Sequence, residues 1–262
     1  MSKLLIGMLS YNRIEMTKRS LESLYANTNI EDFELVILDN GSDKVTTTTL
    51  MKFYKTMKLD GVDNIKLILL DGNIGVADGL NEIIKDRKPD QHFMKMDNDI
   101  VFKDGTNKDW IKKITSCFDL NIDDTMSNVN KIGAVSIKPY TWLENEQKEV
   151  NLIEEFPIVI IGGEEFQYNP EGVTGCSTVY NKEVMNELGN FDKYGLYGYE
   201  DSMFCTRMFL KGYLALYNNQ IARVYHIDPG GETDYLKWKH GQATENFQKY
   251  FDSYTKHTEG KI

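Results

Sequence analysis

The feature that most constrains the fold is a regular alternation of strand and helix patterns along the first 100 residues. Four short apolar runs predict strands, at residues 4–9, 33–38, 65–70 and 92–96. Between the third and fourth runs, Val76, Leu80 and Ile83 recur at helical spacing. Strands that alternate with helices predict an α/β fold, in which a mostly parallel sheet is covered by helices on both faces.

Polar residues follow the predicted strands directly. Tyr11, Asp39, Asp71 and Asp97 come just after the four apolar runs. Open sheets of this kind bind their ligands beyond the carboxyl ends of the strands. We therefore expect these residues to lie near a binding site. Asn12 is expected to cap the helix that follows the first strand.

The second half of the chain has a different pattern. Helices are predicted at residues 110–118, 183–188, 201–210 and 234–254, and strands at residues 132–137, 214–217 and 221–226. The last two strands are expected to pair around Asn218 and Asn219. Residues 140–173 are more typical of hairpins than of further strand–helix units. We find no repeat or clear linker, so the sequence predicts a single domain over residues 1–262.

Composition narrows the classes of protein and of partner. A chain of 262 residues suits one large domain, and a formal net charge of −10 disfavours a nucleic-acid partner without excluding it. Cys117, Cys176 and Cys205 have no Cys-x-x-Cys spacing and are expected to be reduced packing residues. The N-terminus has no signal-peptide pattern, and no stretch reaches the ~18 apolar residues of a membrane span. We expect a cytoplasmic protein.

The strongest local signal for chemistry is the segment Met-Lys-Met-Asp-Asn-Asp-Ile-Val-Phe at residues 94–102. Asp97 and Asp99 lie one residue apart between apolar runs. Divalent cations prefer hard oxygen ligands, and a bound diphosphate needs its charge neutralised. Carboxylates just past a buried strand suit both tasks. An isolated Asp-x-Asp also occurs in ordinary polar turns, so only its context favours the metal.

Several motifs together resemble glycosyltransferase family 2, whose members have the GT-A fold. The matching stretches lie at residues 6–13, 36–42, 73–81, 96–99, 174–176, 189–192 and 199–201. Their order and spacing extend from about residue 4 to about residue 230, which is more specific than any one motif. The resemblance implies a Rossmann-like, mostly parallel sheet with helices on both faces and a small antiparallel extension on the acceptor side.

The resemblance implies a nucleotide-sugar donor, with UDP as the expected nucleotide. Tyr11 would line the nucleobase pocket, and Asp39 would hydrogen-bond the base. Arg13 would reach a phosphate, while Asp71 and Asn73 would line the donor pocket. The structural alternatives are a core aromatic at the tyrosine, a solvated helix-start arginine, and turn-capping polar residues at the other three positions.

The resemblance also implies a metal site for Mn²⁺ or Mg²⁺. Asp99 would ligate the metal, and Asp97 would contact the donor ribose or the water shell of the metal. His226 ends an apolar run, and in some relatives a histidine here supplies a further ligand. A neutral imidazole suits Mn²⁺ better than Mg²⁺. The alternative is a strand-end histidine with no metal.

Glu200 and Asp201 match the second acidic pair of the family. Transfer with inversion needs a base that takes the proton of the acceptor hydroxyl while its oxygen attacks the anomeric carbon. The resemblance implies that Asp201 is this base and that Glu200 orients it or the acceptor. Asp201 is also a candidate N-cap for the helix that follows, and both interpretations can hold together. Arg207 is expected to form a structural ion pair.

Further aromatic and histidine residues have weaker signals. Candidates for stacking on sugar rings are Trp142, Tyr168, Tyr194, Tyr197 and Tyr199, although plain packing is the commoner use of such residues. His92, His240 and His257 have no acidic motif beside them and are expected on the surface.

The chain departs from the usual family pattern in some places. The common Asp-Asp after the second strand is Asp39-Asn40, and the acidic triplet of the metal site is Asp97-Asn98-Asp99. We find neither a membrane-anchoring tail nor the Gln-x-x-Arg-Trp motif of processive members. Single transfers are therefore expected rather than polymer synthesis.

The sequence thus predicts a metal-dependent, inverting glycosyltransferase. Residues 1–102 would bind the donor, residues 103–233 would supply the acceptor side and the base, and residues 234–262 would form a helical tail. The acceptor would be a hydroxyl of a glycan, a lipid-linked molecule or another molecule, with nucleic acid disfavoured by charge.

Two other functions stay open. A nucleotidyltransferase of sugar phosphates would be expected to have a Gly-rich basic loop near the N-terminus, which Ser10-Tyr11-Asn12-Arg13 does not match. A non-catalytic carbohydrate-binding relative would be favoured by loss of Asp99 or Asp201.

Overall fold

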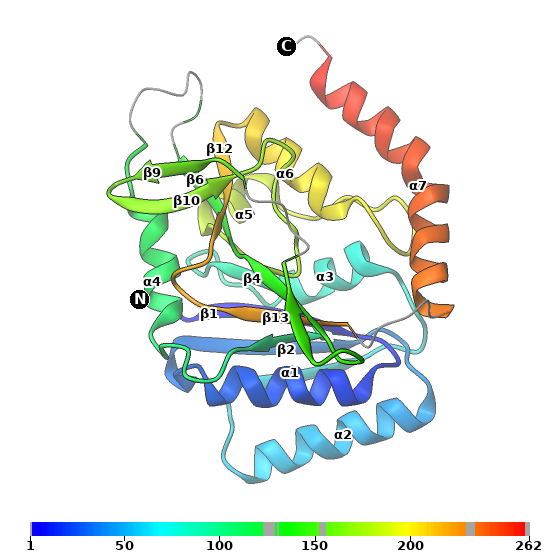
Figure 1. Ribbon diagram of the computed structural model, residues 1–262. Helices are drawn as coiled ribbons and strands as arrows, with labels where there is room; N and C mark the ends of the chain where they lie inside the picture. Colours follow the sequence, from blue (N-terminus) through cyan, green and yellow to red (C-terminus); the bar gives the residue numbers. More distant parts are fainter. Residues whose placement is uncertain (1, 123–128, 130, 152–155, 229–233, 260–262) are drawn as a thin grey trace.

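The computed structural model of the protein describes residues 2–122, 129, 131–151, 156–228 and 234–259 (Figure 1). The helices are α1 (Ile14–Ala26), α2 (Lys44–Leu59), α3 (Val76–Ile84), α4 (Trp110–Ser116), α5 (Lys182–Leu188), α6 (Glu200–Leu210) and α7 (Asp234–Thr258), with the short 3-10 helices η1 (Ile30–Asp32) and η2 (Cys117–Asp119). The strands are β1 (Leu4–Ser10), β2 (Phe33–Asp39), β3 (Ile65–Leu69), β4 (Phe93–Asp97), β5 (Ile100–Phe102), β6 (Lys131–Ile137), β7 (Pro139–Leu143), β8 (Lys148–Val150), β9 (Ile158–Ile161), β10 (Glu164–Tyr168), β11 (Ser177–Tyr180), β12 (Tyr213–Asn218) and β13 (Val224–Asp228).

The central sheet, over the described residues, has nine strands in the order β3-β2-β1-β4-β11-β6-β12-β10-β9. The strands from β3 to β4 pair in parallel, as do β6 and β12. Only β11 and β10 run opposite to their neighbours, so seven of these nine described strands point in one direction. The predicted α/β fold with a mostly parallel sheet is confirmed.

The alternation of side chains along the strands divides the apolar residues between two cores. In β1, Leu4, Ile6 and Met8 pack on the face covered by α1, α2 and α4, whereas Leu5 packs on the face covered by α3, α5 and α6. Successive side chains of a strand point to opposite faces, so a strand buried on both sides is apolar at nearly every position. Burial of each such side chain stabilises the fold by about 1.5–3 kcal/mol.

The strand order reverses at β1, which has β2 on one side and β4 on the other. In open α/β sheets, the crevice at such a reversal binds ligands. β5 begins three residues after β4 ends and belongs to a smaller described sheet of order β5-β13-β7-β8. This smaller sheet is mixed, because β13 pairs antiparallel with β5 and parallel with β7. It is attached beside the crevice.

The predicted pairing of the strands on either side of Asn218 and Asn219 is wrong. β12 lies between β6 and β10 in the large sheet, whereas β13 lies between β5 and β7 in the small one. The Asn218 side-chain oxygen accepts hydrogen bonds from the backbone N–H groups of Gln220 and Ile221, both at 2.8 Å. This turn leads the chain from one sheet to the other and does not close a hairpin.

The predicted capping role of Asn12 is also wrong. Arg13 occupies the N-cap position of α1, without a side-chain cap, and Asn12 has a left-handed φ of 51°. The Asn12 side-chain oxygen accepts a hydrogen bond from the backbone N–H of Asp43 at 2.7 Å. Asn12 therefore joins the loop after β1 to the loop after β2, and its short polar side chain tolerates the left-handed conformation.

His92 is half-buried and not a surface residue. Its ring stacks on Phe118 with 4.8 Å between centroids, and its Nδ1 accepts a hydrogen bond from the backbone N–H of Lys182 at 3.1 Å. Burial lowers the pKa of His92 to about 4, so the ring is neutral at physiological pH. The expected ion pair of Arg207 is confirmed, since its Nη1 lies 2.7 Å from the Asp192 carboxylate.

α7 packs along one side of the body, and its C-terminal end projects away from it (Figure 1). Asn246, 2% exposed, anchors the helix by donating a hydrogen bond to the Tyr197 carbonyl at 3.1 Å. Tyr250 stacks on Tyr199 with 4.5 Å between centroids. Across the described residues, none of the helices has both the length and the apolar composition to span a lipid bilayer.

Candidate active site

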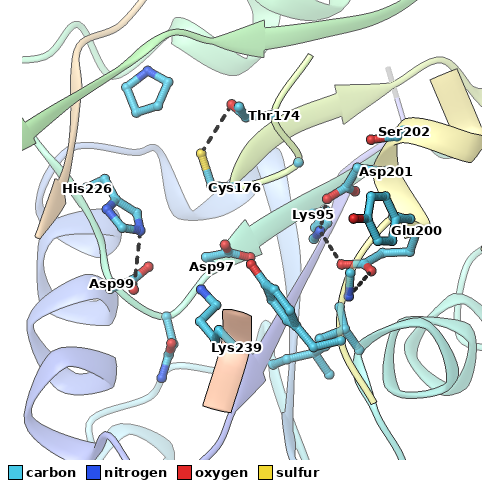
Figure 2. A pocket seen from close by; sticks show the side chains of 18 of the residues that line it. Lys95, Asp97, Asp99, Thr174, Cys176, Glu200, Asp201, Ser202, His226 and Lys239 are labelled. Carbon is cyan, nitrogen blue, oxygen red and sulfur yellow. Dashed lines mark hydrogen bonds and ion pairs between the residues drawn. The ribbon is translucent and has the colours of Figure 1, made fainter. Parts of the chain in front are cut away.

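A cleft of about 640 Å³ opens at the carboxyl ends of β1 and β4, where the strand order reverses (Figure 2). Most of its lining comes from four segments that are distant in the sequence, within residues 9–13, 95–99, 169–176 and 196–202, and single residues of other elements complete it. A cleft therefore lies at the carboxyl ends of the strands, where the sequence predicted a binding site. Tyr11, Arg13, Asn73 and Asp97 are among the predicted site residues that line it.

Asp99 lies in the turn between β4 and β5 and is 4% exposed. Its Oδ2 accepts a hydrogen bond from Arg13 Nη1 at 2.6 Å. Its Oδ1 is buried and accepts no hydrogen bond from the described residues. Buried carboxylate oxygens normally face a donor or a cation. Asp99 Oδ1 is therefore an atom of the cleft that fits a metal ion.

His226 is held beside Asp99 by the pairing of β13 with β5, in which His226 lies opposite Ile100. Its Nε2 lies 3.4 Å from Asp99 Oδ2 (Figure 2). Within the part of the chain that the structure describes, no group of three or more His, Cys, Asp or Glu side chains is arranged to hold a metal. A metal held by Asp99 and His226 would therefore need further ligands from water or substrate phosphates.

Asp39 does not line the cleft. It is fully buried, and its two oxygens accept hydrogen bonds from the hydroxyls of Ser42 and Thr47. The neighbouring Asn40 lines the cleft instead, and it ties down the next loop by donating to the Gly75 carbonyl at 3.1 Å. Contact between Asp39 and a nucleobase stays a prediction, and the local hydrogen bonds are those of a turn-capping aspartate.

Asp71 and Asn73 follow β3 but differ in their surroundings. Asp71 is exposed and lies outside the cleft. Asn73 lines the cleft, and its side-chain oxygen accepts a hydrogen bond from the backbone N–H of Gly75 at 2.8 Å. Gly75 has a φ of 93°, and a Cβ there would lie 3.0 Å from the Gly195 carbonyl oxygen. This glycine therefore permits close contact between the loop after β3 and the segment that leads to Asp201.

Asp201 is the second residue of α6 and not its N-cap. Tyr199 holds the cap position in a left-handed conformation, with a φ of 69° and no side-chain cap. The Asp201 carboxylate lies over Gly175, where a Cβ would be only 2.1 Å from its Oδ1. The glycine of the Thr174-Gly175-Cys176 motif thus leaves room for the carboxylate. Both segments line the same cleft as Asp97 and Asp99.

Lys95 is a site residue that the sequence reasoning missed. It lies in β4, is 4% exposed and forms an ion pair with the Asp201 carboxylate (Figure 2). Its Nζ also lies 3.6 Å from Glu200 Oε1. The sequence did contain a signal for this residue, because Lys95 lies between two methionines in a predicted buried strand. A buried charge requires a partner, so such a lysine indicates a buried ion pair.

The environment of Asp201 is suited to a proton acceptor. Burial raises the pKa of Asp201 to about 6, and the Glu200 carboxylate adds to this rise while Lys95 opposes it. The Asp201 side chain is still 21% exposed, so one side of the carboxylate reaches the cleft. A carboxylate of this kind is ionised at neutral pH and close to the pKa that favours proton transfer there.

Aromatic residues from several parts of the fold line the cleft. Of the predicted stacking candidates, Tyr197 and Tyr199 line it, whereas Trp142, Tyr168 and Tyr194 do not. α7 adds Trp238 and Lys239, which the sequence reasoning did not single out. Lys239 Nζ lies 4.6 Å from the centroid of the Tyr197 ring, and its side chain points into the cleft (Figure 2).

Comparison with known proteins gives a family match over most of the chain. The family model described as Glycosyl transferase family 2 matches residues 5–189. No curated protein matches the chain in sequence. The matched residues include β1, β2, β4 and the Thr174-Gly175-Cys176 motif, whereas α6, β13 and α7 lie beyond them.

Similar solved structures share the fold at low sequence identity. The mannosyltransferase PcManGT from Pyrobaculum calidifontis, in complex with GDP-Man and Mn²⁺, is 15% identical with a TM-score of 0.63 over 95% of this chain and 64% of that one. S. aureus TarS 1-349 in complex with UDP-GlcNAc is 15% identical with a TM-score of 0.67 over 99% and 67%. The chain therefore spans about two thirds of the length of these structures.

Proposed function

The chain belongs to glycosyl transferase family 2 and has the GT-A fold, and from this premise we propose that it transfers a sugar from a nucleotide-sugar donor to an acceptor hydroxyl. The observation that carries the proposal is one cleft lined by two sets of carboxylates. Asp97 ends β4 and Asp99 lies in the turn after it, whereas Asp201 lies in the first turn of α6 on another wall. Metal-assisted departure of a diphosphate and removal of a proton from the acceptor need two such sets.

The donor in this proposal occupies the side of the cleft formed by β1 and β4. Tyr11 lies beside the base, Asn73 lines the pocket, and Asp97 faces the ribose. UDP is the preferred nucleotide, and this choice is supported only by the resemblance of the motifs and by the UDP complexes of TarS. GDP is the alternative, in view of the GDP-Man complex of the mannosyltransferase.

A divalent metal fits the residues on this side of the cleft. Asp99 would hold it through the buried Oδ1 that has no donor among the described residues, and His226 would be a further ligand. Such a metal, Mn²⁺ or Mg²⁺, would supply positive charge to the diphosphate of the donor. Arg13, already paired with Asp99, brings a second positive charge to the same wall.

The reaction proposed is a direct displacement with inversion. Asp201 accepts the proton of the acceptor hydroxyl as the hydroxyl oxygen bonds to the anomeric carbon, and the bond from that carbon to the diphosphate breaks. The exposed part of Asp201 faces the cleft, where an acceptor can reach it. Tyr197, Tyr199 and Trp238 offer apolar faces for a sugar ring beside it.

A donor screen tests this function. The protein is incubated with Mn²⁺ and each common nucleotide sugar, and release of free nucleotide is followed with and without candidate glycan acceptors. Slow hydrolysis of one donor, accelerated by an acceptor, is the expected result. Formation of a nucleotide sugar from a nucleoside triphosphate and a sugar phosphate would instead identify a nucleotidyltransferase. Binding of sugars with no turnover of any donor would identify a carbohydrate-binding relative.

A further inference from the structure

Lys95 stands out among the charged residues because β4 buries it in the wall of the cleft. Its neighbours Met94 and Met96 are core residues, and β4 is flanked by β1 and β11. Lys95 is 4% exposed, which is rare for a lysine unless it is paired. Its partners are carboxylates of α6, an element that begins over a hundred residues later in the chain.

The groups that face Asp201 come from several packed elements. Lys95 of β4 forms an ion pair with Oδ2, and the Tyr180 hydroxyl of β11 lies 3.5 Å from Oδ1. Glu200 precedes Asp201 in α6, and its Oε2 accepts a hydrogen bond from the backbone N–H of Gly198 at 3.0 Å. Asp97 acts on the Asp201 carboxylate only through its charge.

Two carboxylates side by side in a largely buried site would not both stay ionised without a cation, because each raises the pKa of the other and burial adds to the effect. Lys95 is the cation that contacts both of them (Figure 2). Burial by itself lowers the pKa of Lys95, but the carboxylates of Asp201, Glu200 and Asp97 outweigh it and raise that pKa above its usual value. Lys95 therefore stays charged at every pH at which the base works.

We propose that Lys95 is a positioning residue that keeps the Asp201 carboxylate ionised and directed into the cleft, where it serves as the base. This inference rests on the proposed function. In the step itself, the acceptor O–H bond breaks, its proton passes to Asp201 and its oxygen bonds to the anomeric carbon. The donor diphosphate leaves with the electron pair of the broken glycosidic bond. Lys95 holds its proton throughout.

The test is the pH profile of kcat/KM in Lys95→Met, which has a similar shape but no charge. Loss of an opposite charge in direct contact raises a carboxylate pKa by about 1–3 units. The acidic limb of the profile should move to higher pH by about one unit or more, with the rate falling at pH 6–7 and recovering at pH 9. Lys131→Met removes a lysine from an exposed ion pair with Glu183 and should leave the limb in place.

An equal loss of rate at every pH in Lys95→Met, with the acidic limb unmoved, would overturn the inference. If Lys95→Met fails to fold, Lys95→Gln retains a hydrogen-bond donor and should show the same shift. Lys95→Arg retains the positive charge, so the acidic limb of its pH profile should lie at the same pH as in the unchanged protein. An unmoved limb in Lys95→Gln would also overturn the inference.

A second measurement separates this inference from the proposed function. If the unchanged protein transfers no sugar from any donor, the proposed function fails. Thermal unfolding then tests by itself whether the charge of Lys95 keeps the neighbouring carboxylates ionised. Without Lys95, protonation of the buried carboxylates removes their unpaired charge. The stability deficit of Lys95→Met should therefore shrink between pH 8 and pH 5. A deficit that does not change with pH would contradict the charge role.

Discussion

The two aspartates Asp99 and Asp201 have different surroundings in the cleft, and each environment suits a different chemical role. Asp99 is buried and in contact with Arg13 and His226, whereas Asp201 is partly exposed and packs against Lys95 and Gly175. In our proposal, the first carboxylate serves the donor and the second serves the acceptor. Substitutions that preserve shape should therefore give opposite patterns of binding and rate.

Asp201→Asn removes the basic charge with little change of shape. Transfer should fall by ~10²-fold or more, the usual contribution of a positioned base. Affinity for nucleotide and Mn²⁺, measured by calorimetry, should stay close to that of the unchanged protein. Asp99→Asn is the matched comparison and should lose nucleotide affinity together with rate. Near-normal transfer by Asp201→Asn would mean that the base lies elsewhere, with Glu200 the next residue to test.

Gly175→Ala tests the same carboxylate without removing any polar group. The new Cβ would lie 2.1 Å from Asp201 Oδ1, so the carboxylate or the strand end must move. The rate should fall by ~10-fold or more, because small misplacements of a reacting group are costly. Gly241→Ala, in α7 with open space around the new methyl group, should be neutral or slightly stabilising. An active Gly175→Ala enzyme would argue against the tight placement of Asp201.

His226→Ala distinguishes a metal ligand from a strand-end histidine. If His226 binds the metal, Mn²⁺ affinity should fall by ~10-fold or more with little loss of stability. His240→Ala removes an exposed histidine of α7 and is the control. A metal titration of His226→Ala that matches the unchanged protein would leave Asp99 as the protein ligand to be tested alone.

Among the elements, α7 has several contacts with the segment that leads to Asp201. Asn246 holds the Tyr197 carbonyl, Lys249 Nζ donates to the Tyr194 carbonyl at 3.2 Å, and Tyr250 stacks on Tyr199. This segment also contacts the start of α3, since the backbone N–H of Val76 donates to the Leu196 carbonyl at 2.9 Å. The segment is thus held between α7 and the start of α3.

Asn246→Ala should loosen this segment. The Tyr197 carbonyl would lose its donor at a partly buried position, which costs about 1 kcal/mol of stability. The rate of transfer should fall more than nucleotide affinity, because the base lies at the end of the segment. Gln248→Ala, which changes an exposed residue of the same helix, is the control. Equal effects of the two substitutions on rate would show that α7 does not position the base.

At the scale of the whole molecule, the cleft joins residues from the proposed donor half 1–102, the proposed acceptor half 103–233 and α7. A ligand that binds such a cleft stabilises the entire fold, because the folded protein alone has the complete site. This links donor binding to thermal unfolding and offers a measurement that requires no acceptor.

A nucleoside diphosphate with Mn²⁺ should raise the thermal midpoint. At a hundred times its dissociation constant, a ligand adds about 2.7 kcal/mol, or roughly 5–10 °C for a chain of this size. EDTA should abolish this shift together with transfer, and Mn²⁺ should restore both. Full activity in EDTA would refute metal dependence while leaving the base assignment intact.

The sequence by itself determined the four strands of the first half and most of the helices, because apolar periodicity reports local structure and the burial of each face. It did not predict α2 or β11. It also placed polar residues at the carboxyl ends of the strands, and the family resemblance placed the acidic pairs. Only the tertiary structure decided which of these residues face the cleft. Asp39 accepts hydrogen bonds from hydroxyls of the following residues, whereas Asn40 lines the cleft. β13 pairs with β5 in the small sheet and not with β12, which places His226 beside Asp99. The ion pair of Lys95 with Asp201 joins residues over a hundred positions apart, and no local pattern specifies such a contact, because it depends on how whole elements pack.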